Sequence, residues 1–333
     1  MKKIHIEPNK LAFILTNKCT AECDICCFSC SPKNNTFQSL DRIKSLIIDA
    51  SKRKSISTVG FSGGEPFLAY KELLEATQFA HQFGLSIICT SNGFWGADKE
   101  SAKIKLTELQ QAGLSKLSLS CDLFHQQYVP IDSLKNILEI CSELDIPCDI
   151  GSVITKDKSD ISKLTSCISR QLINVPHYRT PCLPIGNAQS KIHPDTLIYD
   201  ERLLEKENHC YECSYLAIYV NGDVFPCCSQ IGEIKQLQLG NIYTDDLQTL
   251  YDAYNANMYL RIIKKYGLIW FLNIAKANNY SPVLNKKYVN KCHLCHTVFS
   301  DSTFLSITKK NISREQDLIY KKYLAHQEYD GRE

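Results

Sequence analysis

The stretch Lys18-Cys19-Thr20-Ala21-Glu22-Cys23-Asp24-Ile25-Cys26 places three cysteines at C-x3-C-x2-C spacing, directly after the apolar run of residues 11–15. Three thiolates on one short loop can bind three irons of a four-iron, four-sulfur cluster and leave the fourth iron without a protein ligand. An open coordination position distinguishes a reactive metal site from a closed structural one. The alternatives are a structural zinc or free buried thiols, although zinc would need a second Cys or His pair nearby.

A second motif, Gly63-Gly64-Glu65-Pro66, follows the apolar stretch of residues 59–61. In this order, one βα unit apart, the two motifs resemble those of radical S-adenosylmethionine (SAM) enzymes. The resemblance implies that SAM chelates the open iron through its amino and carboxyl groups, and that an electron from the cluster cleaves it to a 5′-deoxyadenosyl radical. It also implies that Gly63, Gly64 and Glu65 hold the SAM ammonium.

Residues 1–190 alternate short apolar runs with helical patterns, which predicts βα repeats and a parallel sheet. Six such units predict an α/β fold, a partial (β/α)6 TIM-like barrel with its site at the C-terminal ends of the strands. The expected strands cover residues 11–16, 58–62, 86–90, 116–120 and 148–154, with a sixth just before Pro184. The expected helices cover residues 39–50, 73–83, 106–112, 134–144 and 161–170.

The resemblance also assigns SAM contacts at the ends of later strands. It places Ser91 and Asn92 near SAM, Ser120 and Asp122 near its ribose or carboxylate, and Ile185, with Gly186 beside it, against the adenine. Each position has an ordinary alternative. Ser-Asn-Gly is a good turn sequence, Asp122 could cap a helix, and an isolated Ile is usually core.

A second cysteine set follows Pro194. Two apolar runs, residues 216–220 and 224–228, flank Asn221-Gly222 and predict a hairpin. A cysteine before the hairpin, one at its end and a distant C-x2-C supply four thiolates for a closed second four-iron, four-sulfur cluster. The spacing resembles the Twitch or SPASM auxiliary-cluster domain, in its single-cluster form, and the proposed ligands are Cys210, Cys227, Cys292 and Cys295.

Two alternatives stay open for this set. A zinc ribbon could use the same four cysteines, because tetrahedral thiolate sites suit zinc equally well. Cys213 could replace Cys210 as the ligand. The expected domain division is a radical SAM core over residues 1–190, an auxiliary iron–sulfur domain over 191–300 with helical segments at 246–254 and 260–277, and a helical tail over 301–333.

Cys228 carries the functional prediction. It follows Cys227, and neighbours on an extended strand point to opposite faces, so one of the two thiols stays free beside the active site. The hairpin, the helical stretch around Trp270 and the closing C-x2-C together resemble radical SAM peptide epimerases. That resemblance implies abstraction of a Cα hydrogen from an L-residue of a ribosomally made peptide. Cys228 then donates hydrogen to the other face, which gives the D-residue.

Composition limits the remaining classes. The chain has 333 residues, 17 cysteines and a net charge of +2, with no secretory signal and no run of transmembrane length. We therefore expect a cytoplasmic enzyme with reduced thiols, two clusters and SAM, a precursor peptide as partner and an electron donor such as flavodoxin or ferredoxin. We expect neither nucleic acid nor a membrane as partner, nor a separate peptide-recognition domain, since 18 residues precede Cys19.

The competing hypotheses are another radical SAM peptide maturase, which forms thioether or carbon–carbon crosslinks, and a non-catalytic iron–sulfur or zinc scaffold. Crosslinking would remove two hydrogens from the peptide, whereas epimerisation leaves its mass unchanged. A scaffold would leave SAM uncleaved, and it would have no need of an ammonium-binding acid at Glu65.

Overall fold

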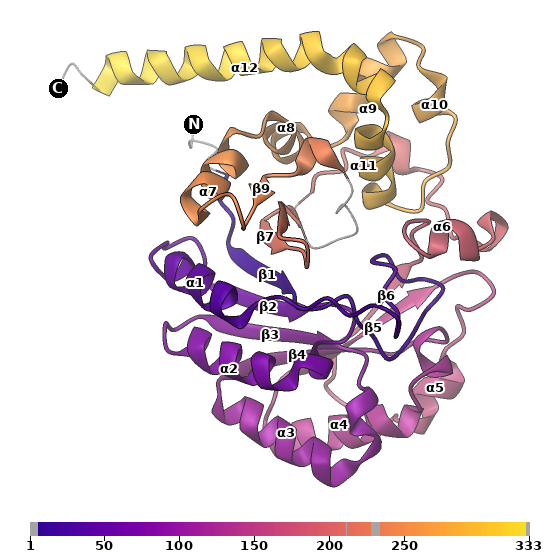
Figure 1. Ribbon diagram of the computed structural model, residues 1–333. Coiled ribbons are helices and arrows are strands. Elements are labelled where there is room, and N and C mark those ends of the chain that lie inside the picture. Colours follow the sequence, from indigo (N-terminus) through magenta and orange to yellow (C-terminus); the bar gives the residue numbers. More distant parts are fainter. Residues whose placement is uncertain (1–5, 211, 228–233, 331–333) are drawn as a thin grey trace.

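The computed structural model describes residues 6–210, 212–227 and 234–330, and a nine-stranded sheet organises them (Figure 1). The strand order is β6-β5-β4-β3-β2-β1-β7-β8-β9, and neighbouring strands from β6 through β1 to β7 are all parallel. The expected α/β fold with a six-stranded partial barrel is therefore confirmed. None of the described helices is long and apolar enough to cross a membrane.

The six barrel strands come from residues 10–181 of the chain. Two of them, β2 and β5, have the bounds that the apolar runs predicted, and the others shift by a few residues. The sixth strand lies where it was expected, shortly before Pro184, but all its residues except the last are exposed. The bounds are β1 Lys10–Ile14, β2 Thr58–Ser62, β3 Ser86–Ser91, β4 Leu114–Ser120, β5 Cys148–Ile154 and β6 His177–Pro181.

Helices cover the outer face of the barrel. The third begins at Lys99, seven residues before the predicted start, because its first turns are polar and show no apolar period. Asp98 caps it by accepting hydrogen bonds from the backbone of Glu100 and Ser101. These helices are α1 Leu40–Ser51, α2 Tyr70–His81, α3 Lys99–Gln111, α4 Ile131–Glu143, α5 Ser162–Cys167 and α6 Ala188–Lys191. The short 3₁₀ turns of the chain are Pro66–Ala69, Phe94–Ala97, His125–Gln127, Pro194–Thr196, Leu203–Glu205 and Lys235–Leu237.

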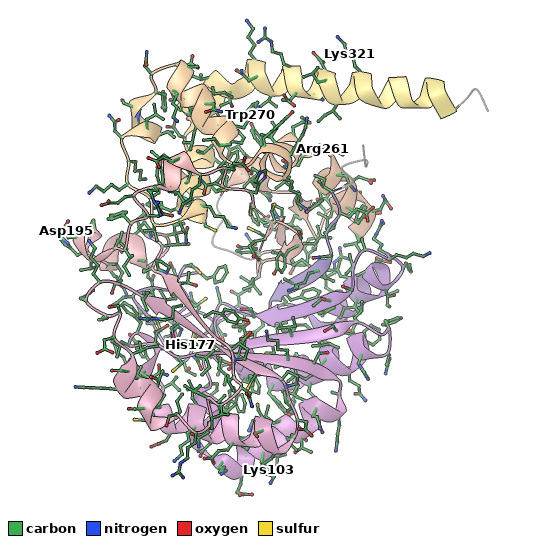
Figure 2. All side chains as sticks on the ribbon, turned by 180° about the vertical axis from the view of Figure 1, so that it is seen from behind. Lys103, His177, Asp195, Arg261, Trp270 and Lys321 are labelled. Atoms are coloured by element: carbon green, nitrogen blue, oxygen red, sulfur yellow. The ribbon has the colours of Figure 1, made fainter. Side chains whose placement is uncertain are left out.

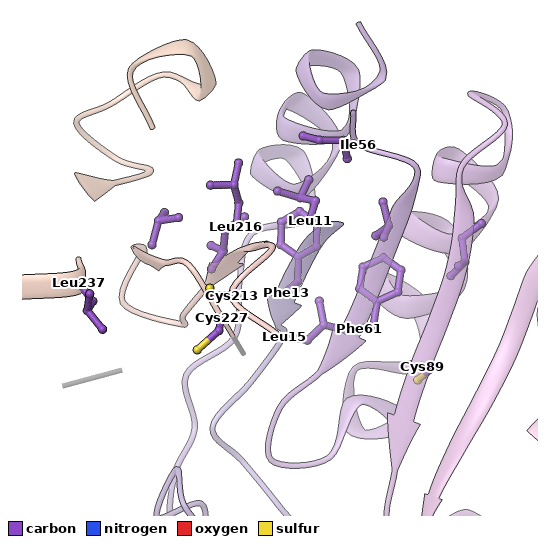
Figure 3. Close-up of a cluster of buried hydrophobic side chains, with 14 of the residues drawn as sticks. Leu11, Phe13, Leu15, Ile56, Phe61, Cys89, Cys213, Leu216, Cys227 and Leu237 are labelled. Atoms are coloured by element: carbon purple, nitrogen blue, oxygen red, sulfur yellow. The ribbon is translucent and has the colours of Figure 1, made fainter. Parts of the chain in front are cut away.

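The predicted hairpin does not stand apart from the barrel. It forms β7 Tyr215–Ile218 and β8 Asp223–Phe225, with β9 Gly240–Asn241 added beyond. Strand β7 pairs in parallel with β1, so that Leu11 lies opposite Leu216, about two hundred positions later in the chain. Figure 3 shows the resulting core, in which Cys213 and Cys227 lie close to the apolar side chains of β1 and β7.

The C-terminal half ends in a helical layer beside β7–β9 (Figure 1). The helical stretch predicted over residues 260–277 is divided into two helices at Gly267. The φ of this residue is 77°, a conformation that favours glycine, and a Cβ there would clash with the carbonyl oxygen of Glu207. Trp270 and Arg261 lie in this layer, far from Lys103 on α3 (Figure 2). Its helices are α7 Leu247–Ala256, α8 Met258–Tyr266, α9 Ile269–Ala277, α10 Ser281–Leu284, α11 Lys291–Ser300 and α12 Ser302–Asp330.

Candidate active site

The three cysteines of the first motif lie on the loop between β1 and α1, at the C-terminal end of the barrel. Cys19 and Cys23 are buried and Cys26 is half-buried. A turn in which the Cys26 N–H donates to the Cys23 carbonyl at 3.0 Å brings the last two together. Burial raises the pKa of Cys19 to about 11 and raises that of Cys23 further. A bound metal would offset the cost of ionising these buried thiols, because a thiol that coordinates a metal is deprotonated.

Cys30 forms hydrogen bonds with Cys26 of this loop. Its N–H donates to Cys26 Sγ at 3.3 Å, and its buried thiol hydrogen-bonds to the same sulfur. The hydrogen bond from the Cys30 thiol lowers the pKa of Cys26 to about 6, although burial opposes the shift. Hydrogen bonds to ligating sulfurs are one of the means by which proteins tune iron–sulfur clusters.

The Gly-Gly-Glu segment after β2 runs directly alongside the cysteine loop. Gly64 N–H donates to the Thr16 carbonyl at 2.7 Å and Glu65 N–H donates to the Lys18 carbonyl at 2.9 Å. A Cβ on Gly63 would approach the Thr16 carbonyl oxygen to 2.6 Å, and one on Gly64 would clash with that of Lys18. Both glycines are therefore needed for the close contact that aligns Glu65 with the cysteines.

The Glu65 carboxylate is fully buried and held by three donors. Its Oε1 accepts from Phe67 N–H at 3.0 Å and from Ser91 Oγ at 2.8 Å, and its Oε2 accepts from Asn92 N–H at 2.8 Å. Burial raises its pKa to about 7, against the lowering effect of these hydrogen bonds. A buried acid of this kind suits a bound ammonium group, which would supply the missing positive charge.

Asn92 connects that acid to the cysteine loop. Besides its backbone bond to Glu65, its side-chain amide donates to Cys19 Sγ at 3.6 Å and to Thr20 Oγ1 at 3.1 Å. Ser91 likewise receives a second partner, the indole N–H of Trp95, at 2.9 Å. The structure thus brings the expected residues of β1, β2 and β3 into one hydrogen-bonded group.

Asp122, which follows β4, is also buried, and its carboxylate faces protein groups. Its oxygens accept from the backbone N–H groups of Phe124, His125 and Val153 at 2.9–3.0 Å, and from His125 Nδ1 at 2.9 Å. Burial acts to raise its pKa, but the positive His125 and these hydrogen bonds bring it below the usual value. His125 escaped the sequence analysis, since a single His three residues after an Asp carries no motif by itself.

The remaining expected SAM contacts lie on β4 and beside the cysteine loop. Ser120 on β4 lies opposite Gly151 on β5, and a Cβ on Gly151 would meet nothing within 4 Å. Ile185 is buried among the side chains around the cysteine loop. Gly186, with φ 60°, packs so closely on that loop that a Cβ would lie 2.6 Å from the Cys26 carbonyl oxygen. Gly151 thus leaves its face of the sheet open, whereas Gly186 is needed for close packing on the cysteine loop.

The second cysteine set lines one small cavity, with a free volume of about 20 Å³. All four expected ligands line it, together with the alternative Cys213, and apolar side chains from α8 complete its wall. The Cys213 thiol hydrogen-bonds to Cys210 and lowers the pKa of that thiol to about 6, against the effect of burial. The five thiols are Cys210, Cys213, Cys227, Cys292 and Cys295.

The spread of these thiols favours a cluster over a single ion. A zinc site requires its ligands to converge on one point at about 2.3 Å. Nowhere in the described part of the chain do three or more His, Cys, Asp or Glu side chains converge in that way. A four-iron cluster attaches each thiolate to a different iron, so it needs thiols that surround a volume. The five thiols line one cavity, so the ligand type that such a cluster needs is present there.

The side chain of Lys264 lies close to the cavity and carries a positive charge. Lys264 on α8 donates to the Tyr254 hydroxyl at 2.8 Å, and Tyr254, fully buried, donates to the Cys213 carbonyl at 2.6 Å. Burial lowers the pKa of Lys264, whereas Cys213 and Cys210 act to raise it. Among the described residues Lys264 has no carboxylate partner, so an anionic occupant of the cavity would provide its counter-charge.

The two cysteine sites lie near each other. Cys292 of the auxiliary set packs against the apolar cluster that contains Cys19 and Cys23. An aromatic contact also joins them, because the ring of Phe28, on the cysteine loop, lies 5.7 Å from that of Tyr219 at the end of β7. Cys228, the predicted hydrogen donor, lies outside the described residues, which stop at Cys227 in this segment.

Comparison with known proteins agrees with this arrangement. The sequence profile of the radical SAM superfamily matches residues 13–157, and that of an iron–sulfur cluster-binding domain, SPASM, matches residues 210–296. The first range contains the cysteine loop and the Gly-Gly-Glu segment. The second begins at Cys210 and ends just after Cys295, so it encloses the five-cysteine cavity.

One curated relative extends over most of the chain. The "Putative peptide biosynthesis protein YydG" of Bacillus subtilis (strain 168) is 30% identical over 292 residues, which cover 86% of this chain and 91% of that protein.

Among solved structures, native anSMEcpe with bound AdoMet has a TM-score of 0.59 at 14% identity, covering 92% of this chain and 99% of that one. SuiB of Streptococcus suis bound to S-adenosylmethionine has a TM-score of 0.52 at 15% identity, covering 81% and 74%. At these identities the structural likeness establishes the fold.

Proposed function

Because this chain belongs to the radical SAM superfamily and carries a SPASM iron–sulfur domain, we propose that it is a peptide epimerase. Its substrate would be a ribosomally made peptide, in which it inverts L-residues to D-residues. Its cofactors are a four-iron, four-sulfur cluster with SAM and auxiliary iron–sulfur chemistry. The observation that carries the proposal is that Cys227 lines the five-cysteine cavity and is followed directly by a further thiol, Cys228.

The first site supports the initiation step. Cys19, Cys23 and Cys26 would hold the SAM-binding cluster, and the buried Glu65 carboxylate would bind the SAM ammonium. When bound, this pair supplies a 5′-deoxyadenosyl radical that takes the Cα hydrogen of an L-residue. Gly151 on β5, where an added Cβ would meet nothing within 4 Å, keeps its face of the sheet open for a ligand.

Cys228 would complete the inversion. Its thiol donates a hydrogen atom to the planar Cα radical from the face opposite the abstraction, which fixes the D configuration. The resulting thiyl needs one electron and one proton to return to the thiol. We assign the electron to an external donor of the flavodoxin or ferredoxin type, acting through the auxiliary site at Cys210, Cys227, Cys292 and Cys295. One SAM is consumed in each turnover.

A peptide substrate has independent support. The curated relative carries a peptide-biosynthesis name, and anSMEcpe has been solved with AdoMet and the Kp18Cys peptide, at a TM-score of 0.57, 16% identity and coverage of 77% of this chain and 83% of that one. The second candidate is a crosslinking peptide maturase, which the fifth thiol of the cavity favours, because one cysteine beyond the four needed could bind substrate.

The test uses reconstituted, anaerobically reduced protein with a short peptide encoded beside its gene, in deuterated water. Epimerisation predicts SAM cleavage and a gain of one deuterium at Cα for each residue found in the D form after hydrolysis. Cys228→Ala should abolish inversion and leave SAM cleavage intact, whereas Cys167→Ala, which removes an exposed thiol on α5, should behave as wild type. A product lighter by two hydrogens would identify the crosslinking reaction instead.

A further inference from the structure

The polar pair at the end of β4 has a role that the proposed function leaves open. Asp122 was expected to contact SAM, yet its buried carboxylate already accepts three backbone hydrogen bonds and the imidazole N–H of His125. A carboxylate would also repel the carboxylate of SAM. These contacts favour a different task for Asp122, which is to fix the orientation and charge of His125.

His125 is held in one orientation beside the site. Its Nδ1 lies 2.9 Å and 3.0 Å from the two Asp122 oxygens, so this nitrogen donates and the other, Nε2, is left for another partner. The side chain keeps 20% of its surface accessible, whereas that of Asp122 is fully buried. The neighbouring Phe124 lies in the buried cluster that contains Cys19 and Cys23, and Tyr128, three residues after His125, donates its hydroxyl to the Glu22 carbonyl of the cysteine loop at 2.9 Å.

The methionyl end of SAM carries one ammonium and one carboxylate. Glu65 matches the ammonium, and the His125 imidazole, which Asp122 holds through Nδ1, offers Nε2–H as a donor for the carboxylate at the same end of the barrel. We propose that His125 binds the carboxylate of SAM through Nε2–H, with Asp122 as the positioning residue that holds the ring. This inference depends on the proposed function only in that SAM is the bound cofactor.

Lys158 is the competing cation. Its Nζ lies 4.3 Å from the ring centre of Phe124, which precedes His125 in the chain. Within the described residues, no hydrogen bond or ion pair joins Lys158 to Glu65, Cys26 or Asp122. The orientation that Asp122 imposes on His125 therefore makes the imidazole the better candidate, and Lys158→Met provides a direct comparison.

The test compares SAM with decarboxylated SAM, which lacks only the carboxylate. Dissociation constants are measured on anaerobically reconstituted protein by calorimetry, and SAM-induced changes in the EPR signal of the reduced cluster give a second readout. His125→Gln should weaken SAM binding by about tenfold to a hundredfold, the range for one charge-assisted hydrogen bond. Binding of decarboxylated SAM should be unchanged. Chelation of iron by the SAM carboxylate affects wild type and variant alike. A change in the preference for SAM over decarboxylated SAM would therefore be caused by the loss of the His125 imidazole.

The matched control is His193→Gln. His193 is also an imidazole beside an aspartate, Asp195, at 3.6 Å, but both side chains are exposed. Figure 2 shows Asp195 at the edge of the molecule. Three outcomes would overturn the proposal. His125→Gln could weaken the binding of SAM and decarboxylated SAM equally, or weaken neither. Alternatively, only Lys158→Met could lose the preference for SAM over decarboxylated SAM. A protein that binds SAM through His125 but leaves peptide stereochemistry unchanged would refute the epimerase and not this inference.

Discussion

The side-chain amide of Asn92 lies 3.6 Å from Cys19 Sγ, and the same residue donates its backbone N–H to Glu65. One residue at the end of β3 therefore contacts both a cysteine that we assign to the cluster and the acid that we assign to the SAM ammonium. The two halves of the SAM site are thus fixed to each other by a rigid β-strand end and not only through the ligand.

This relationship predicts an effect on the cluster itself. Asn92→Ala removes an N–H donor from Cys19 Sγ, so negative charge on the sulfur is less stabilised and the midpoint potential should fall by tens of millivolts. Spectroelectrochemical titration of the SAM-free cluster measures it. Asn136→Ala serves as control, because it removes a side-chain amide of α4 that donates to the Gly96 carbonyl at 2.9 Å. Equal potentials in the two variants would contradict the assignment.

SAM binding should depend on pH through Glu65. Burial raises the pKa of this carboxyl to about 7 in the ligand-free protein, and only the ionised form attracts an ammonium. Affinity should therefore be full above pH 7 and fall by about tenfold for each pH unit below it. Calorimetric titrations between pH 6 and 8 test this. Glu65→Gln should bind weakly at every pH, and a wild-type affinity that rises on acidification would have the wrong sign.

Iron content should distinguish the auxiliary ligands. Two clusters predict about eight irons for each chain, and loss of one predicts about four. Cys292→Ala and Cys295→Ala should each lower the count towards four while SAM cleavage is retained, because the first site is untouched. Comparing Cys210→Ala with Cys213→Ala identifies the remaining ligand, since both line the cavity. Cys167→Ala should keep the full count, and one iron or zinc ion at the second site would indicate a ribbon instead.

Local patterns were sufficient for the barrel and for most of the first site. Strands β2 and β5 have the bounds that their apolar runs predicted, because a buried parallel strand shows itself as a short continuous apolar segment. The Cys19 loop and Glu65 could be proposed as site residues because both motifs resemble those of radical SAM enzymes, and the structure places the two segments side by side. In each case the information lies within a few neighbouring residues.

Contacts between distant segments escaped the sequence analysis. The pairing of β1 with β7 joins Leu11 to Leu216, and nothing in either apolar run specifies that partner. The helix break at Gly267 depends on a close contact with Glu207, which is distant in sequence. The apolar periodicity of the sequence runs through residue 267 without a change, so it did not predict the break. His125 became interpretable only when the fold showed that Asp122 is saturated by backbone donors. Tertiary contacts, more than local propensity, decided these features.

The cation behind the five-cysteine cavity gives a last prediction. Lys264 contacts Tyr254 at 2.8 Å and Ser214 at 3.5 Å, with no carboxylate partner in the described chain, whereas its neighbour Lys265 pairs with Glu315 at 3.5 Å. A cation near a cluster favours its reduction, so Lys264→Met should lower the auxiliary midpoint potential by tens of millivolts, which corresponds to about 1 kcal/mol for one electron.

Lys265→Met is the matched control, since it removes the adjacent charge from a site that faces α12. Lys264→Arg, which keeps the charge, should retain a potential near wild type and so separates electrostatics from lost packing. EPR-monitored redox titration of each variant, with the SAM-binding cluster as internal reference, provides the measurement. If Lys264→Met and Lys265→Met shifted the auxiliary potential equally, the cation would have no specific influence on this cavity, and the electron route through it would lose its electrostatic support.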